Sequence, residues 1–135
     1  MASKWYPLGV EAMLEAEGDW SDAGIKMALT TTTYNAAHDY YADVSASTVD
    51  TPKALANPVL TVAGSVLKYD ADDTGLTWAA LAAGSTITGV IVYLDTGNAA
   101  TSPLLTFNDC TDTATNGGDI TIEINASGIG TIDFT

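Results

Sequence analysis

The sequence predicts an all-β protein, mainly an antiparallel β-sandwich or jelly-roll-like barrel, with a short helix or arm at the N-terminus. Short segments rich in Val, Ile and Thr recur about every ten residues with turn residues between them, a pattern typical of such folds. Only the start of the chain has a helical pattern, which argues against a βαβ architecture. The 135 residues and the apolar fraction of 47% fit one domain with a real core.

The N-terminal segment is where a helix is expected. Residues 10–17 are good helix formers with apolar side chains three to four positions apart, and Gly18 follows as a stop signal. Two turns of helix are not stable alone in water, so this segment must pack on its own domain or on a partner. We therefore divide the chain into an N-terminal arm, residues 1–22, and a single β-domain, residues 23–135.

The remaining strands are expected in order along the chain. Their ranges are 25–30, 59–63, 65–69, 86–94, 103–107, 120–125 and 129–134, with 76–81 ambiguous between strand and helical turn. The almost continuous apolar run of 86–94 indicates a central strand covered on both faces. Residues 120–125 alternate isoleucine with polar residues, which indicates one buried face. Residues 34–44 are expected to form a turn or one helical turn.

Turn and loop residues mark the connections. Residues 45–58 contain Ser, Thr, Asp and two prolines, and we expect a long exposed loop there. The Asn-Gly-Gly sequence at 116–118 is a hairpin signal between two strands.

The charge of the chain is strongly acidic. It has 17 acidic residues against four lysines, and these lysines are scattered along the sequence. Binding to nucleic acid or to an anionic membrane surface needs clustered basic residues, so neither partner is expected. The acidity favours solubility and repulsion between neighbouring molecules. No signal peptide and no apolar run long enough to span a bilayer are recognised, which predicts synthesis in a cytoplasm.

Few residues are suited to catalysis, and we expect neither an enzyme nor a cofactor. His38 is the one histidine and Cys110 the one cysteine, so a zinc site or a disulfide within the chain is excluded. His38 lies in none of the sequence contexts that accompany a catalytic nucleophile. Cys110 is expected to be a small buried apolar residue. A pair of carboxylates as in glycosidases is not excluded by count, although the acids lie mostly in turns.

One acidic turn is a weak candidate for a cation site. Asp70, Asp72 and Asp73 precede Gly75 with the spacing that opens an EF-hand loop. The twelfth position, however, holds Leu81 instead of the bidentate glutamate. The alternative, an acidic turn that keeps the strands soluble, is the preferred interpretation.

Several segments resemble a family of short structural proteins of tailed-bacteriophage virions. The segments that carry the resemblance are 25–30, 33–34, 76–80, 88–97, 100–105, 120–125 and 128–132, in this order. The stretch 93–105 is its most specific part, and the region 45–62 departs most from the family pattern. The resemblance covers most of the chain from residue 25 onward.

This resemblance implies a virion component, and we expect a capsid decoration (cement) protein on the outside of the head. The implied partners are the major capsid protein and copies of this chain, arranged as a homo-oligomer such as a trimer. The expected docking residues are aromatic and apolar: Trp5, Tyr6, Met13, Leu14 and Trp20 first, then Tyr34, Tyr40 and Tyr41. The alternative for each of them is a place in the core of its own domain.

Two other functions remain open from the sequence. One is a receptor- or carbohydrate-binding module of a tail or head fibre, with the tyrosines of residues 34–41 and the acids of 70–73 forming the site. The other is a tail-tube or head–tail connector subunit, which would form rings.

Overall fold

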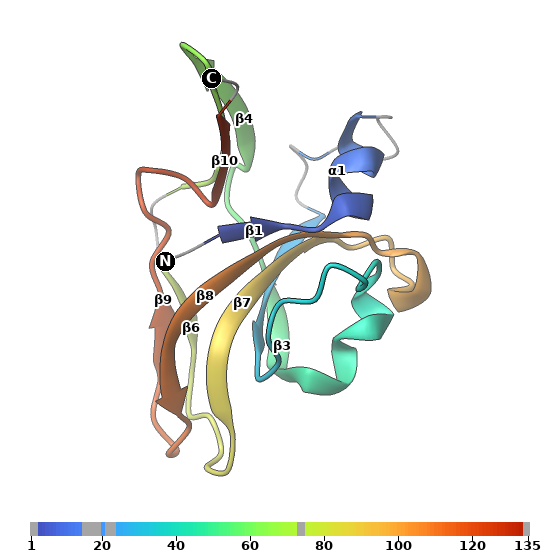
Figure 1. Ribbon diagram of the computed structural model, residues 1–135. Helices are drawn as coiled ribbons and strands as arrows, with labels where there is room; N and C mark the ends of the chain where they lie inside the picture. The colour runs from blue at the N-terminus through green and yellow to red at the C-terminus, as the bar shows by residue number, and fades with distance from the viewer. Residues whose placement is uncertain (1–2, 15–19, 21–23, 73–74, 134–135) are drawn as a thin grey trace.

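A computed structural model describes residues 3–14, 20, 24–72 and 75–133, and it confirms an all-β fold built from antiparallel sheets with one short N-terminal helix. The strands are β1 (Ser3–Trp5), β2 (Ile25–Thr30), β3 (Thr48–Ala54), β4 (Val59–Ala63), β5 (Val66–Asp70), β6 (Leu76–Trp78), β7 (Thr86–Leu94), β8 (Leu104–Ala114), β9 (Ile120–Ile122) and β10 (Gly130–Asp133). Helix α1 spans Pro7–Leu14, and short 3₁₀ turns form at Tyr41–Asp43, Ser45–Ser47 and Ala99–Thr101. Figure 1 shows the long curved strands β7 and β8 at the centre of the molecule.

The described strands form three sheets. A five-stranded sheet has the order β1-β8-β7-β2-β3, a three-stranded sheet has the order β10-β5-β4, and β6 pairs with β9. Strand β7 is therefore central, and residues 89–94 are all buried, as the apolar run predicted. The predicted bounds of β2, β4 and β7 are confirmed, and the alternating burial of residues 120–124 is confirmed as well.

The five-stranded sheet is buried on both faces because each face has its own apolar cluster. On one face, Met27, Val90 and Val92 pack with residues of the smaller sheets and their loops, among them Tyr69 and Trp78. On the other face, a second cluster consists of Tyr6, Ala28, Val44, Ile91, Tyr93, Leu104 and Phe107. Neighbours along β2 and β7 alternate between the two clusters, as the two-residue period of a strand requires.

The N-terminal segment belongs to the main sheet. Strand β1 pairs antiparallel with β8, and the Tyr6 amide continues this pairing by donating a hydrogen bond to the Leu105 carbonyl at 2.9 Å. Helix α1 then lies so close to β8 that a Cβ at Gly9 would be 1.9 Å from the Leu104 carbonyl oxygen. The helix begins at Pro7, three residues before the predicted start. The expected division at residue 22 thus cuts between residues that share one sheet.

The predicted loop at 45–58 is wrong in its middle, where the chain forms strand β3. This strand pairs with β2 at the edge of the sheet, and the register shifts between Met27 and Leu29. Asp50 has a positive φ of 62°, and Pro52 is tolerated because an edge strand leaves one side of its backbone unpaired. The hairpin predicted around residues 116–118 is also wrong, since β8 and β9 lie in different sheets.

The three-stranded sheet differs from the main sheet in its exposure. Strand β5 has only Tyr69 fully buried, and all five residues of β4 are exposed. Figure 1 shows β4 and β10 at the top of the view, projecting away from the curved strands β7 and β8. This sheet therefore presents strand β4 to the surroundings.

Candidate functional site

The N-terminal aromatic residues expected to dock on a partner lie in or against the domain. Tyr6 and Trp20 are buried in the two core clusters, so we withdraw them from the docking set. Trp5 is half-buried, and its indole Nε1 donates a hydrogen bond to the Thr131 carbonyl at 3.1 Å. Met13 packs partly buried against the core. The side chain of Leu14 lies outside what the structure describes.

The tyrosines of the 34–41 segment cover the opposite face of the main sheet. The Tyr34 ring packs 5.2 Å from the Tyr6 ring, and its hydroxyl donates to the Trp5 carbonyl at 2.8 Å. The Tyr41 ring stacks on Tyr93 with centroids 4.4 Å apart. Tyr40 alone among the three is exposed, at 37%. The segment thus forms part of the core and leaves one tyrosine for an external contact.

Burial changes the acidity of two of these phenols. The pKa values of Tyr6 and Tyr93 are raised above the ordinary value, mainly because burial disfavours the charged form and further because a second tyrosine lies close to each. The buried hydroxyl of Tyr6 has no hydrogen-bond partner among the residues that the structure describes. Both phenols therefore stay neutral over the physiological pH range and serve as packing groups.

The loop around His38 is organised by Asp43. Its carboxylate accepts hydrogen bonds from the amides of Tyr40 at 3.0 Å and Asp39 at 2.9 Å, and these bonds lower the pKa of Asp43. The carboxylate thereby closes the turn that carries Tyr40. This geometry fixes a backbone conformation and explains why an acid stands at this position.

The acidic turn after β5 has its carboxylates engaged by the protein itself. Asp70 forms an ion pair with Lys68 at 3.0 Å, and Asp72 accepts a hydrogen bond from Asn57 at 2.8 Å. Asp73, the third expected cation ligand, lies outside the described residues. Within the described part of the chain, no group of three or more His, Cys, Asp or Glu residues is placed to hold a metal ion.

The single thiol is held in its protonated form. The pKa of Cys110 is raised by burial and by the nearby carboxylates of Asp109 and Asp112. A thiol with a raised pKa is a poor nucleophile because the thiolate is the reactive species.

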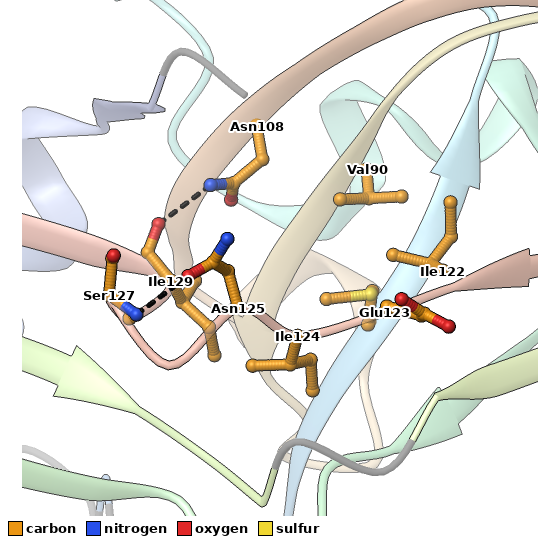
Figure 2. A pocket seen from close by; sticks show the side chains of 10 residues that line it. Val90, Asn108, Ile122, Glu123, Ile124, Asn125, Ser127 and Ile129 are labelled. Atoms are coloured by element: carbon orange, nitrogen blue, oxygen red, sulfur yellow. Dashed lines mark hydrogen bonds between the residues drawn. The ribbon is translucent and has the colours of Figure 1, made fainter.

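A pocket opens between the main sheet and the segment that joins β9 to β10. It has a volume of about 250 Å³, and Val90 and Asn108 on the sheet face Ile124 and Ile129 on that segment (Figure 2). The Asn108 side chain is already used, since its Nδ2 donates to the Ile129 carbonyl at 2.6 Å and its Oδ1 accepts from Thr106. Asn125 likewise accepts from the Ser127 amide at 2.8 Å. Asn108 thus holds the segment against the sheet, and the Asn125 bond closes a turn within the segment.

Among the described residues, three of the exposed large apolar side chains lie on strand β4, where no contact surface was predicted. Val59 is 43% exposed, Leu60 39% and Val62 70%, on a strand that ends its sheet. Residues 54–67 contain no charged residue, although the chain carries a net charge of −13. The stretch 74–94 is also uncharged and is longer, so the lack of charge alone does not single out this strand in the sequence. An exposed apolar strand at the edge of a sheet offers its unpaired backbone and its side chains to another chain.

Comparisons with protein-family models, curated proteins and solved structures found no match to this chain. The helix that the structure describes is too short to cross a membrane. The resemblance to tailed-phage proteins is not tested by these comparisons and stays a prediction.

Proposed function

We propose that this protein is a structural component of a bacteriophage virion, a capsid decoration protein that binds the outside of the head and strengthens contacts between capsid subunits. The observation that carries the proposal is the exposed, uncharged, apolar strand β4 on a domain that is otherwise strongly acidic. Such a surface suits a protein contact, because burying it removes apolar area from water without burying a charge. The resemblance of the sequence to virion proteins supports the same class of function.

Cementing would use weak contacts repeated over a lattice. The acidic surface keeps free molecules apart in solution, because net charges of −13 repel each other. On a capsid, the local concentration of neighbouring copies is high, and contacts too weak to hold two free molecules together can then form. Each contact adds resistance to the separation of the subunits beneath it. The capsid surface is the expected location of the protein.

The packing of the tyrosines argues against the carbohydrate-binding alternative. A sugar stacks on an exposed aromatic face, whereas Tyr34 packs on Tyr6 and Tyr41 packs on Tyr93. Only Tyr40 is left with an exposed ring. A glycan array that showed binding sensitive to Tyr40→Ala would reverse this judgement.

Co-sedimentation with phage heads that lack the protein tests the proposal. We expect saturable binding of the purified protein and greater resistance of the loaded heads to heat or chelator. A truncation of the first residues is unsuitable, since Tyr6 belongs to the core and its loss would destabilise the domain. Val62→Lys is the informative variant, because it places a charge on the exposed strand that carries the proposal, and Ala82→Lys at another exposed position is its matched control. Absence of binding to heads would contradict the proposal and favour a tail or fibre role.

A further inference from the structure

We propose that strand β4 pairs with β4 of a second copy of this chain, so that two three-stranded sheets join into one continuous six-stranded sheet. The two strands run antiparallel around a two-fold axis at Thr61. Leu60 then lies opposite Val62 of the second copy, and Val59 lies opposite Ala63. This inference deepens the proposed function, because it names what covers β4 between neighbouring copies.

The backbone of β4 has hydrogen-bonding groups directed outward at two residues. The loop that joins β4 to β5 has two residues, with Gly64 first at a φ of 61°, as in tight hairpin turns. Leu60 lies opposite Tyr69 on β5. The Tyr69 carbonyl points away from β4 and accepts a hydrogen bond from the Ile129 amide at 2.7 Å. Pairs in an antiparallel ladder alternate between bonded and non-bonded, so Leu60 and Val62 direct their N–H and C=O groups away from β5. Pairing around Thr61 joins these groups in four hydrogen bonds.

In the described part of the chain, the other sheet edges are protected against pairing with another molecule, and β4 is not. Natural proteins protect edge strands with charges, proline, short length or a covering group. Strand β3 contains Asp50, Pro52 and Lys53. Strands β1, β6 and β9 have only three residues each. Strand β4 has five residues, is exposed throughout, and contains neither a charge nor a proline.

The opposite edge of the same sheet is covered, which favours a two-fold contact over an open chain of molecules. Trp5 reaches strand β10 and donates its indole hydrogen bond to the Thr131 carbonyl at 3.1 Å. A Cβ at Gly130 would lie 2.9 Å from the Trp5 ring, so the ring packs directly on β10. Head-to-tail pairing of β4 with β10 of the next copy would have to displace this ring. Pairing of β4 with itself displaces nothing.

Strand β4 itself brings no charge into the contact. The charged residues of β5 that pair with β4 are Lys68, opposite Thr61, and Asp70, opposite Val59, and they form an ion pair at 3.0 Å. In the paired sheet, the two β5 strands are three strand spacings apart, roughly 14 Å. This separation exceeds the Debye length of about 8 Å at physiological salt.

The contact is expected to be weak in solution. Specific stable complexes bury at least about 1,200 Å², and two paired five-residue strands bury less than that. The net negative charge of each copy also opposes association. We therefore expect a dissociation constant above about 10 µM. The dimer should strengthen with added salt, because salt screens the repulsion.

Sedimentation analysis of the purified protein from about 1 µM to about 1 mM tests the pairing. We expect a monomer–dimer equilibrium that Val62→Lys weakens at least about tenfold, since a charge on an edge strand opposes pairing. Ala82→Lys adds the same charge at another exposed position and should leave the equilibrium unchanged. Thermal unfolding of both variants checks that the fold is intact.

A cysteine cross-link tests the register. In a Cys110→Ser background, Thr61→Cys should form an intermolecular disulfide on mild oxidation, because non-bonded antiparallel pairs bring Cα atoms to about 4.5 Å. Val59→Cys should not cross-link, since the two copies of this residue would lie roughly 13 Å apart.

The possible outcomes separate this inference from the proposed function, because the test needs only purified protein. A protein that stays monomeric at the highest concentration, forms trimers, or dimerises equally well with Val62→Lys would overturn the pairing. Binding of such a protein to heads would leave the proposed function standing. A dimer with the predicted cross-link that failed to bind heads would contradict only the function.

Discussion

Strands β7 and β4 are alike in sequence and opposite in environment. Both lack charged residues and are rich in valine, and both were predicted as strands with their observed bounds. Strand β7 is central in a five-stranded sheet with both faces covered, whereas β4 ends a three-stranded sheet and is exposed throughout. Lack of charge and strand propensity therefore predict the backbone conformation of both strands, whereas burial was predicted only from the longer apolar run of β7. What covers a strand depends on the strands and loops that the rest of the chain supplies.

The largest loss of stability is expected from a substitution in the N-terminal segment, which packs on the main sheet. Tyr6→Ala removes a fully buried ring that packs on β7 and β8, and should lower the free energy of unfolding by about 3–5 kcal/mol. Urea unfolding followed by tryptophan fluorescence measures this loss. An unchanged midpoint would mean that the first residues form a detachable arm after all.

Tyr6→Phe removes the hydroxyl and keeps the ring, so it separates their contributions to stability. Within the described part of the chain the buried hydroxyl has no hydrogen-bond partner, so its removal relieves a desolvation penalty. We expect stability equal to the original protein or greater by about 1 kcal/mol. A clear loss of stability in the same urea experiment would show that the hydroxyl has a partner in solution.

The same substitution in β7 and in β4 tests the contrast between the two strands directly. Val92 is 0% exposed and Val62 is 70% exposed. Val92→Ala should cost about 2–3 kcal/mol, because it removes buried methyl groups and leaves a cavity. Val62→Ala should change the unfolding free energy by less than about 0.5 kcal/mol at low protein concentration. Equal losses at the two positions would contradict the exposure of β4.

A smaller loss of stability is expected from a substitution at the contact between helix α1 and strand β8. An added methyl group in Gly9→Ala would meet the Leu104 carbonyl oxygen at 1.9 Å, so the helix must move away from the strand. Overpacking of this kind should cost about 1–3 kcal/mol. The expected readout is a lower thermal midpoint, together with faster amide exchange in residues 7–13. A variant as stable as the original would place the helix farther from β8.

The smallest effect is expected at the ion pair between Lys26 and Asp95, whose atoms lie 2.6 Å apart. The Lys26 hydrogen bond and the Gly97 amide lower the pKa of Asp95 in the folded state. The stabilisation is therefore present above the unfolded pKa of about 3.9 and is lost as the pH falls through the lower folded value. Asp95→Asn should cost at most about 1 kcal/mol near neutral pH, because the pair is partly exposed.

Urea unfolding of both proteins at about pH 7 and about pH 3 measures that difference. The difference should shrink at the lower pH. A difference that grew on acidification would have the wrong sign for a carboxylate with a lowered pKa.

Much of the fold could be predicted from local sequence, because strand segments such as 25–30 and 86–94 have strong β propensity. Strand β3 was missed because Asp50 and Pro52 are turn residues by propensity. An edge strand accepts them, since pairing with β2 on one side is enough to hold it. The mistaken hairpin at 116–118 has a similar cause: a turn signal shows where the chain reverses but not which strand it pairs with.

The candidate site was harder to predict than the fold. Aromatic residues near the N-terminus suggested a docking surface, but Tyr6 and Trp20 fill space between elements distant in sequence. The exposure of β4 could not be foreseen for the same reason. Residues 54–67 lack charge, but so do the buried run 86–94 and the exposed residues 96–101, so the sequence alone does not single out β4.

Amide hydrogen exchange in β4 at low and high protein concentration tests most directly whether this strand is a contact surface. At low concentration, the amides of Leu60 and Val62 should exchange fast, while those of Thr61 and Ala63, paired with β5, exchange more slowly. At high concentration, we predict that Leu60 and Val62 become protected while β7 stays unchanged. Exchange at Leu60 and Val62 that stays fast at every concentration, including on phage heads loaded with the protein, would contradict a contact through β4.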